Sequence, residues 1–107
     1  MNAQEARKIS VMNQYTIAQE RIAHEANFGR KSCLPYLHGA LYSEVAEMLA
    51  KEGYNVKTVF CRDDSRSYTV VSWDHAVEGE FQEGTVTVVY DYETAEDDET
   101  ETSSANE

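Results

Sequence analysis

The side chains best suited to metal binding or nucleophilic chemistry are Cys33, His38, Cys61 and His75. A structural zinc site usually takes its ligands in close pairs. Here 4 residues separate the first two, 22 the next two and 13 the last two, a spacing that does not indicate a metal site. The two cysteines could form a disulfide if their strands were neighbours. Without a secretory signal we expect reduced, partly buried thiols and no cofactor.

Neither cysteine has the sequence neighbours of a catalytic nucleophile. A reactive thiolate requires an accessible, electropositive niche. Arg30 and Lys31 lie near Cys33, but Asp63 follows Cys61 closely, and nothing completes a triad. The 5 glycines stand one at a time, so no phosphate-binding loop is present. We therefore predict that the protein is not an enzyme and has no catalytic residues.

Charge gives the strongest functional indication. The chain has 9 Lys and Arg against 20 Asp and Glu, a net charge of −11, and its last basic residue is Arg66. Such a surface repels nucleic acid and membranes and attracts basic proteins. We expect no direct binding to nucleic acid or to membranes. The expected partner is a basic or nucleic-acid-binding protein, on which carboxylates of this chain stand in for the phosphates of a nucleic acid. The alternative is that the acidic residues only keep the protein soluble. The residues expected to bind the partner are Glu78, Glu80, Glu83, Asp91, Tyr90 and Tyr92.

Aromatic residues concentrate around the predicted strands. On strands such side chains are usually half-buried members of a core. Exposed together, they would instead form a patch for a protein partner or a small ligand. The residues concerned are Tyr36, Tyr42, Tyr54, Tyr68, Trp73, Phe81, Tyr90 and Tyr92.

A β-hairpin over residues 54–73, YNVKTVFCRDDSRSYTVVSW, is the centre of the predicted fold. Both halves show the period of two that a strand imposes, and residues 63–66 are turn formers. Because a two-stranded hairpin is marginally stable in water, the helices must pack on it.

The first helix should begin at Ala3, since Asn2 and Glu5 have the spacing of a capping box, and it should end near Gly29. One apolar stripe is predicted along it, made of Val11, Tyr15, Ala18, Ile22 and Ala26. A second stripe lies beside it. Either this helix is wedged between the sheet and another helix, or the second stripe contacts a second copy of the chain in a homodimer. That second stripe is Ile9, Met12, Thr16 and Ala23.

The remaining elements follow from shorter patterns. Residues 32–37 predict a strand, placed at a sheet edge because Pro35 has no N–H to donate. A second helix is expected over residues 40–52, followed by Gly53 as its C-cap. After a loop at residues 74–79, residues 85–92 predict a strand, with residues 80–82 pairing to it through a turn at Glu83 and Gly84.

These elements predict an α+β fold in which two helices pack on one face of a small, mainly antiparallel β-sheet. The domain should span residues 1–92. Residues 93–107 hold 7 acids and no large apolar residue, so we predict a disordered acidic tail. No apolar run is long enough to span a bilayer, and the N-terminus is polar, which favours the cytoplasm.

Residues 3–73 resemble small accessory proteins of tailed bacteriophages. The similar stretches are AQEARKIS, NFGRKS, GYNV and SYTVVSW, about two thirds of the chain. Members of the group often stop near the equivalent of Ser72 and Trp73, so residues 74–107 depart from the pattern. The resemblance implies an α-β-α-β-β core and an accessory role in the host cytoplasm, and it brings no catalytic residues.

The sequence therefore favours a non-catalytic phage accessory protein that binds and modulates, most simply inhibits, a host protein. One alternative is a virion or assembly component. Another is an oligomeric sequestering protein that holds a small anionic signalling ligand among tyrosines and Arg7, Arg21, Arg30 and Lys31.

Overall fold

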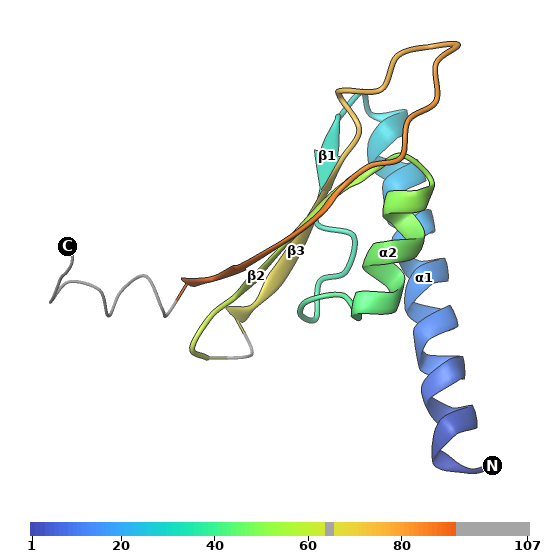
Figure 1. Cartoon of the computed structure of the whole chain (residues 1–107), viewed down its shortest axis with the longest axis vertical. Helices are drawn as coiled ribbons and strands as arrows, with labels where there is room; N and C mark the ends of the chain where they lie inside the picture. Colours follow the sequence, from blue (N-terminus) through green and yellow to red (C-terminus); the bar gives the residue numbers. More distant parts are fainter. Residues whose placement is uncertain (64–65, 92–107) are drawn as a thin grey trace, which may run out of the picture.

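The computed structural model describes residues 1–63 and 66–91 and contains two helices and a four-stranded sheet, an α+β fold (Figure 1). The predicted acidic tail and Tyr92 lie outside the described residues. Up to Ser72 the element order is the α-β-α-β-β that the resemblance implies. In chain order the elements are α1 (Ala3–Asn27), β1 (Ser32–Cys33), α2 (Ser43–Lys51), β2 (Asn55–Phe60), β3 (Tyr68–Ser72) and β4 (Val86–Tyr90).

The predicted hairpin is confirmed, but the sheet is mixed. β2 and β3 are antiparallel, with Val56 opposite Val71, and β1 pairs antiparallel with the outer side of β3. β4 instead joins the free edge of β2 in parallel, giving the order β1-β3-β2-β4. Two of the three strand pairings are therefore antiparallel, in agreement with the expected mainly antiparallel sheet, and the parallel pairing of β4 with β2 is the part that the sequence did not predict. Residues 80–82 do not pair with β4 either: Glu80 bridges to Val77.

α1 begins where the sequence predicts. The Asn2 side chain accepts a hydrogen bond from the Glu5 N–H at 2.9 Å, and the Asn2 N–H donates to the Glu5 carboxylate at 2.9 Å, so the capping box is confirmed. Gly29, with a φ of 80°, follows the helix end. The buried residues of α1 are Val11, Gln14, Ala18, Ile22 and Glu25, so the predicted stripe holds at three of its five positions.

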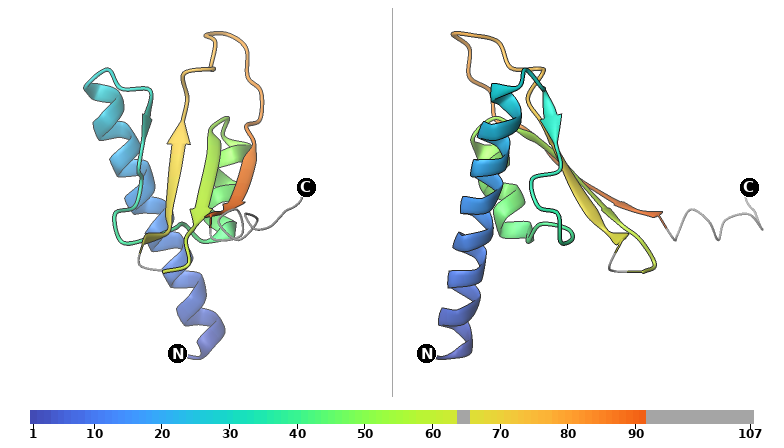
Figure 2. Two further views of the ribbon diagram at one scale, coloured as in Figure 1. Left: turned by 90° about the vertical axis from the view of Figure 1, so that its left-hand side faces the viewer. Right: turned by 180° about the vertical axis from the view of Figure 1, so that it is seen from behind.

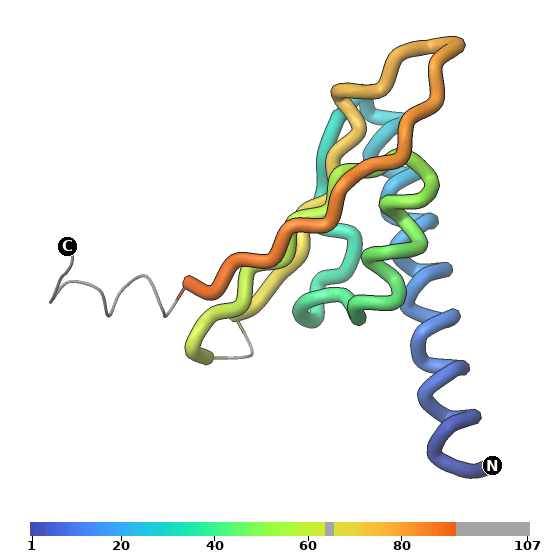
Figure 3. The backbone as a smooth tube through the Cα atoms, viewed as in Figure 1, coloured from blue at the N-terminus to red at the C-terminus, as the bar shows by residue number. Residues whose placement is uncertain are grey.

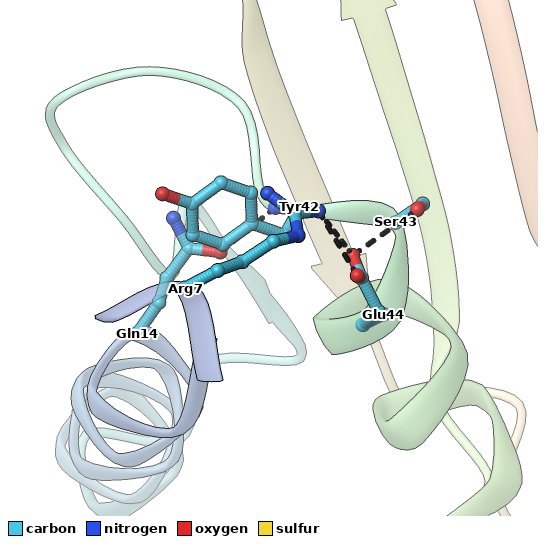
Figure 4. Close-up of polar contacts among 5 residues, drawn as sticks. All are labelled: Arg7, Gln14, Tyr42, Ser43 and Glu44. Carbon is cyan, nitrogen blue, oxygen red and sulfur yellow. Dashed lines mark hydrogen bonds and ion pairs between the residues drawn. The ribbon is translucent and has the colours of Figure 1, made fainter. Parts of the chain in front are cut away.

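α2 begins at Ser43, later than predicted, because Tyr42 has an extended backbone and acts as its N-cap. The cap makes no side-chain bond of its own. Instead the buried Gln14 side chain of α1 accepts the Tyr42 N–H at 2.8 Å, and Arg7 contacts both oxygens of Glu44 while lying 4.9 Å from the centroid of the Tyr42 ring (Figure 4). The two helices are thus joined at the start of α2.

The core lies between the helices and the centre of the sheet. Its fully buried members include Val45 and Leu49 of α2 and Val56 and Val71 of the hairpin. In the two views of Figure 2 both helices lie on the same side of the sheet, and the far half of the sheet extends beyond them.

β1 is shorter than predicted, with two residues in place of six; it occupies a sheet edge as predicted, although Pro35, the residue from which this was argued, lies outside the strand. Pro35 itself is buried in the turn that follows. No helix within the described ranges is long and apolar enough to cross a lipid bilayer.

Candidate binding site

A pocket of about 280 Å³ lies where the C-terminal part of α1, the α2–β2 turn and the segment after β3 meet. We call residues 74–85, which join β3 to β4, the connecting segment. Figure 3 shows this segment as the loop at the top of the molecule, beside the end of α1 and the α2–β2 turn. The pocket lining is Ile22, Ala26, Glu52, Gly53, Tyr54, Trp73, His75, Ala76, Val77, Glu80, Phe81 and Gln82.

Two glycines allow the walls of this pocket to meet. Gly53 has a φ of 103°, which turns the chain sharply after α2. Gly84 donates its N–H to the Ala50 carbonyl at 2.7 Å, and a Cβ atom at Gly84 would lie only 1.8 Å from the Tyr54 carbonyl oxygen. The connecting segment can therefore approach the α2–β2 turn only with glycine at position 84.

Side-chain hydrogen bonds fasten the two ends of the connecting segment. His75 Nε2 lies 2.8 Å from the Gly53 carbonyl oxygen, and its Nδ1 lies 3.3 Å from the Asn55 amide nitrogen. In a neutral ring this geometry places the hydrogen on Nε2, which donates to the carbonyl. The Asn55 side-chain oxygen accepts from both the N–H and the hydroxyl of Thr85. The position of His75 is therefore explained by a fastening role.

The aromatic lining comes from three elements. Tyr54 and Trp73 pack edge to face, with centroids 6.1 Å apart and planes at 89°, and both lie against the core. Burial, followed by the charge of Glu52, raises the pKa of Tyr54. Phe81 lines the pocket from the connecting segment and is 69% exposed. The pocket thus combines one exposed ring with two that pack against the core.

The polar lining is acidic. The Glu52 carboxylate is held in place by the Tyr15 hydroxyl and by the Gln19 side-chain nitrogen, the latter at 2.6 Å. The hydrogen bond to Glu52 is the main cause of the raised pKa of Tyr15. Glu80 stands on the exposed connecting segment, and no Lys or Arg lines the pocket. The ion pairs found within the described residues use Glu25 and Glu44.

The predicted partner-binding residues do not form a single patch. Glu78, Glu80 and Glu83 lie together on the exposed connecting segment, and only Glu80 lines the pocket. Tyr90 and Asp91 lie at the other end of β4 (Figure 1). A five-residue strand spans about 17 Å, so Asp91 is separated from the three glutamates by at least that length. Tyr92 lies outside the described residues.

The predicted second stripe of α1 is accessible along the helix. Ile9 is 54% and Met12 46% exposed, and Thr16 and Ala23 are exposed as well. Of the aromatic residues, Tyr36, Tyr42, Tyr54 and Trp73 pack against the core, whereas Tyr68, Phe81 and Tyr90 are exposed.

The cysteines are free and lie at different ends of the sheet. Cys33 is opposite Val71, which pairs with Val56 near the start of β2, while Cys61 follows the end of β2. Burial, with a further effect of the Glu25 charge, raises the pKa of Cys33 to about 11, so its thiolate is scarce at neutral pH. Residues 1–63 and 66–91 contain no group of three His, Cys, Asp or Glu side chains placed to hold a metal ion.

Of the basic residues considered for an anionic ligand, Arg21 and Arg30 share one carboxylate and Arg7 lies apart from them. Arg7 pairs with Glu44, and both Arg21 and Arg30 pair with Glu25. Arg7 stands in the second turn of α1 and Arg30 after its end, roughly 30 Å apart at the helical rise. These arginines already have carboxylate partners within the chain.

Sequence reasoning named Glu80, which lines the pocket, but did not predict the pocket itself. The sequence features that could have indicated the pocket are Gly53 and Gly84, since isolated glycines often mark close approaches of the backbone. Nothing in the sequence shows, however, that these two positions meet. In comparisons with known proteins the chain matched no protein-family model, no curated protein and no solved structure.

Proposed function

We propose that this protein is a non-catalytic binding protein that attaches to a basic, for example nucleic-acid-binding, protein of a host cell and modulates it, most simply by inhibition. The resemblance to phage accessory proteins supports a bacterial host. The single observation that carries the proposal is the connecting segment, which bears three exposed glutamates and forms part of a pocket whose lining, among the described residues, holds carboxylates and neither lysine nor arginine.

Long-range attraction is the first physical reason. Glu78, Glu80 and Glu83 sit within six residues on one exposed segment, so their fields add at the same place. A partner that carries a basic surface is steered toward this end of the molecule, and its association rate should fall with added salt. Because individual exposed ion pairs contribute little, the three carboxylates act as a group.

Short-range contact is the second reason. Val77 is 60% and Phe81 69% exposed, and both lie on the same segment as the glutamates. Apolar side chains surrounded by charged ones are the usual composition of a recognition site, in which the apolar residues supply affinity and the charges supply rate and specificity.

The test is capture of partners from a bacterial lysate by the full chain and by a variant with Glu78→Gln, Glu80→Gln and Glu83→Gln. A matched control carries Glu96→Gln, Glu99→Gln and Glu101→Gln, which changes the net charge of −11 by the same three units. We expect one basic protein to be captured by the chain and by the control, and to be lost at about 0.5 M salt or with the first variant. A partner retained equally by all three proteins at every salt concentration would contradict the proposal.

A further inference from the structure

The pocket beside the connecting segment combines two kinds of side chain that both attract cations. Tyr54, Trp73 and Phe81 supply aromatic rings, and Glu52 and Glu80 supply carboxylates. Aromatic faces attract cations through their quadrupoles, and carboxylates attract them directly. A ligand that satisfies both is an organic cation with a flat, weakly hydrated surface.

We propose that this pocket binds the guanidinium group of an arginine side chain presented by the partner protein. The inference rests on the proposed function and adds the kind of residue that the partner must present. Arginine suits the lining better than lysine, because its planar group stacks on an aromatic face while its N–H groups contact a carboxylate in a bidentate pair.

The size of the pocket agrees with a single side chain. Its volume of about 280 Å³ lies just below the roughly 300–1,000 Å³ that sites for whole small molecules occupy. The pocket is therefore sized for one extended side chain.

The carboxylates of Glu52 and Glu80 have different surroundings. Glu52 is oriented by the Tyr15 hydroxyl and the Gln19 amide, both on α1, so a cation would meet a fixed acceptor. Glu80 makes no ion pair with a basic residue of the described chain, so its charge is available to a partner. His75, which also lines the pocket, is held by Gly53 and Asn55.

Other classes of ligand fit less well. An anionic group would be repelled by both carboxylates. A purely apolar side chain would displace water from Glu52 and Glu80 without offering them a hydrogen bond, which is costly. An arginine covers the rings with its stem and satisfies the carboxylates with its head group.

Trp73, the only tryptophan in the chain, lines the pocket and reports its occupancy by fluorescence. The folded full-length protein is titrated with the peptide acetyl-Gly-Arg-Gly-amide and with the same peptide carrying citrulline, which has the shape of arginine without its charge. We expect a saturable change with the arginine peptide and none with the citrulline peptide. Equal binding of the citrulline peptide, or of a lysine peptide, would overturn the proposal.

Two matched variants distinguish binding in the pocket from long-range electrostatic attraction. Glu80→Gln and Glu78→Gln remove the same charge from the same exposed segment, but only Glu80 lines the pocket. We expect the first to weaken binding of the arginine peptide by about 5- to 10-fold and the second by less than about 2-fold. Phe81→Ala should weaken it by a similar factor to Glu80→Gln, because a stacking face is lost.

Equal losses with Glu78→Gln and Glu80→Gln would overturn the pocket assignment, while capture of a basic partner could still succeed and leave the proposed function standing. Conversely, specific binding of the arginine peptide with no basic partner captured from lysate would support the pocket and contradict the proposed function.

Discussion

Residues 1–73 and residues 74–91 are built in opposite ways. Every buried residue of the described chain lies in the first region, including Val45, Leu49 and Val71, whereas in the second region no residue is buried. All Lys and Arg residues also lie in the first region, and the described part of the second has only acidic charges. The second region is attached through backbone hydrogen bonds, a glycine contact, polar side chains and the stacking of the Tyr90 ring on Phe60.

This contrast has a functional meaning. The first region can supply its own core, so the second contributes little to hydrophobic stability and is available for recognition. Its attachment nevertheless fixes the position of the connecting segment, because Asn55, Gly53 and Ala50 of the first region hold it at several points. Four predictions test the contrast, from the largest expected effect to the smallest.

The core of the first region should carry the global stability. Leu49→Ala removes a fully buried side chain from the centre of the core, and we expect a loss of about 3–4 kcal/mol in the free energy of unfolding. Val88→Ala in β4, where the valine is 47% exposed, should cost less than about 1 kcal/mol. Urea denaturation followed by circular dichroism measures both. Comparable losses in the free energy of unfolding of the two variants would contradict this difference between the regions.

Gly84→Ala should detach the second region more than it unfolds the first. The added Cβ would lie 1.8 Å from the Tyr54 carbonyl oxygen, so the backbone must separate there, at a cost of about 2–4 kcal/mol. Hydrogen exchange should show lost protection in β4 with protection of β3 retained. Gly79→Ala is the control: its φ of 84° is strained for alanine, but no atom lies near the new Cβ. If β4 kept its protection in Gly84→Ala, the close approach would not be what attaches it.

A buried hydroxyl pair joins the hairpin to the chain before α2. Thr69 Oγ1 accepts the Leu41 N–H at 2.9 Å and shares a hydrogen bond with the Thr58 hydroxyl at 2.9 Å. Thr69→Val leaves both groups without this partner, so we expect a loss of about 1–3 kcal/mol. Thr87→Val, at an exposed position of β4, should change the free energy by less than about 0.5 kcal/mol. Thermal denaturation of the two variants would reveal whether this difference exists.

Alkaline pH should weaken the first region slightly. The pKa of Cys33 is raised to about 11, and those of Tyr54 and Tyr15 are also raised, so the folded state holds protons that the unfolded state releases earlier. The free energy of unfolding should therefore be unaffected below about pH 9 and fall as the pH rises toward 11. Urea midpoints across this range test it, and Cys33→Ala should flatten the decline. A midpoint that rises with pH would contradict the sign.

The sequence predicts those parts of the fold that depend on local chemistry. The capping box at Asn2 and Glu5, the hairpin and the edge position of the strand before Pro35 follow from side-chain type and period, and the structure confirms them. The start of α2 was predicted too early, because the N–H of Tyr42 is satisfied by Gln14, a residue 28 positions earlier.

The pairing of β4 could not be predicted from the local sequence for a similar reason. Alternation in residues 85–92 indicates a strand and its two faces, but it does not tell which neighbour the strand pairs with or in which direction. That choice depends on the contact between Gly84 and Tyr54, which are 30 positions apart. The pocket could not be predicted, since its walls come together through this and other contacts between positions far apart in the sequence.

The position of the N-terminus affects how the protein can be attached to a surface or to a fusion partner. Met1 stands at the N-terminal end of α1, whereas the pocket lies against Ile22 and Ala26 near the other end of that helix (Figure 1). β4 likewise carries the chain from the connecting segment toward Asp91, away from the pocket. A fusion partner or surface tether joined at the N-terminus would therefore begin far from the pocket, which leaves the pocket turned outward.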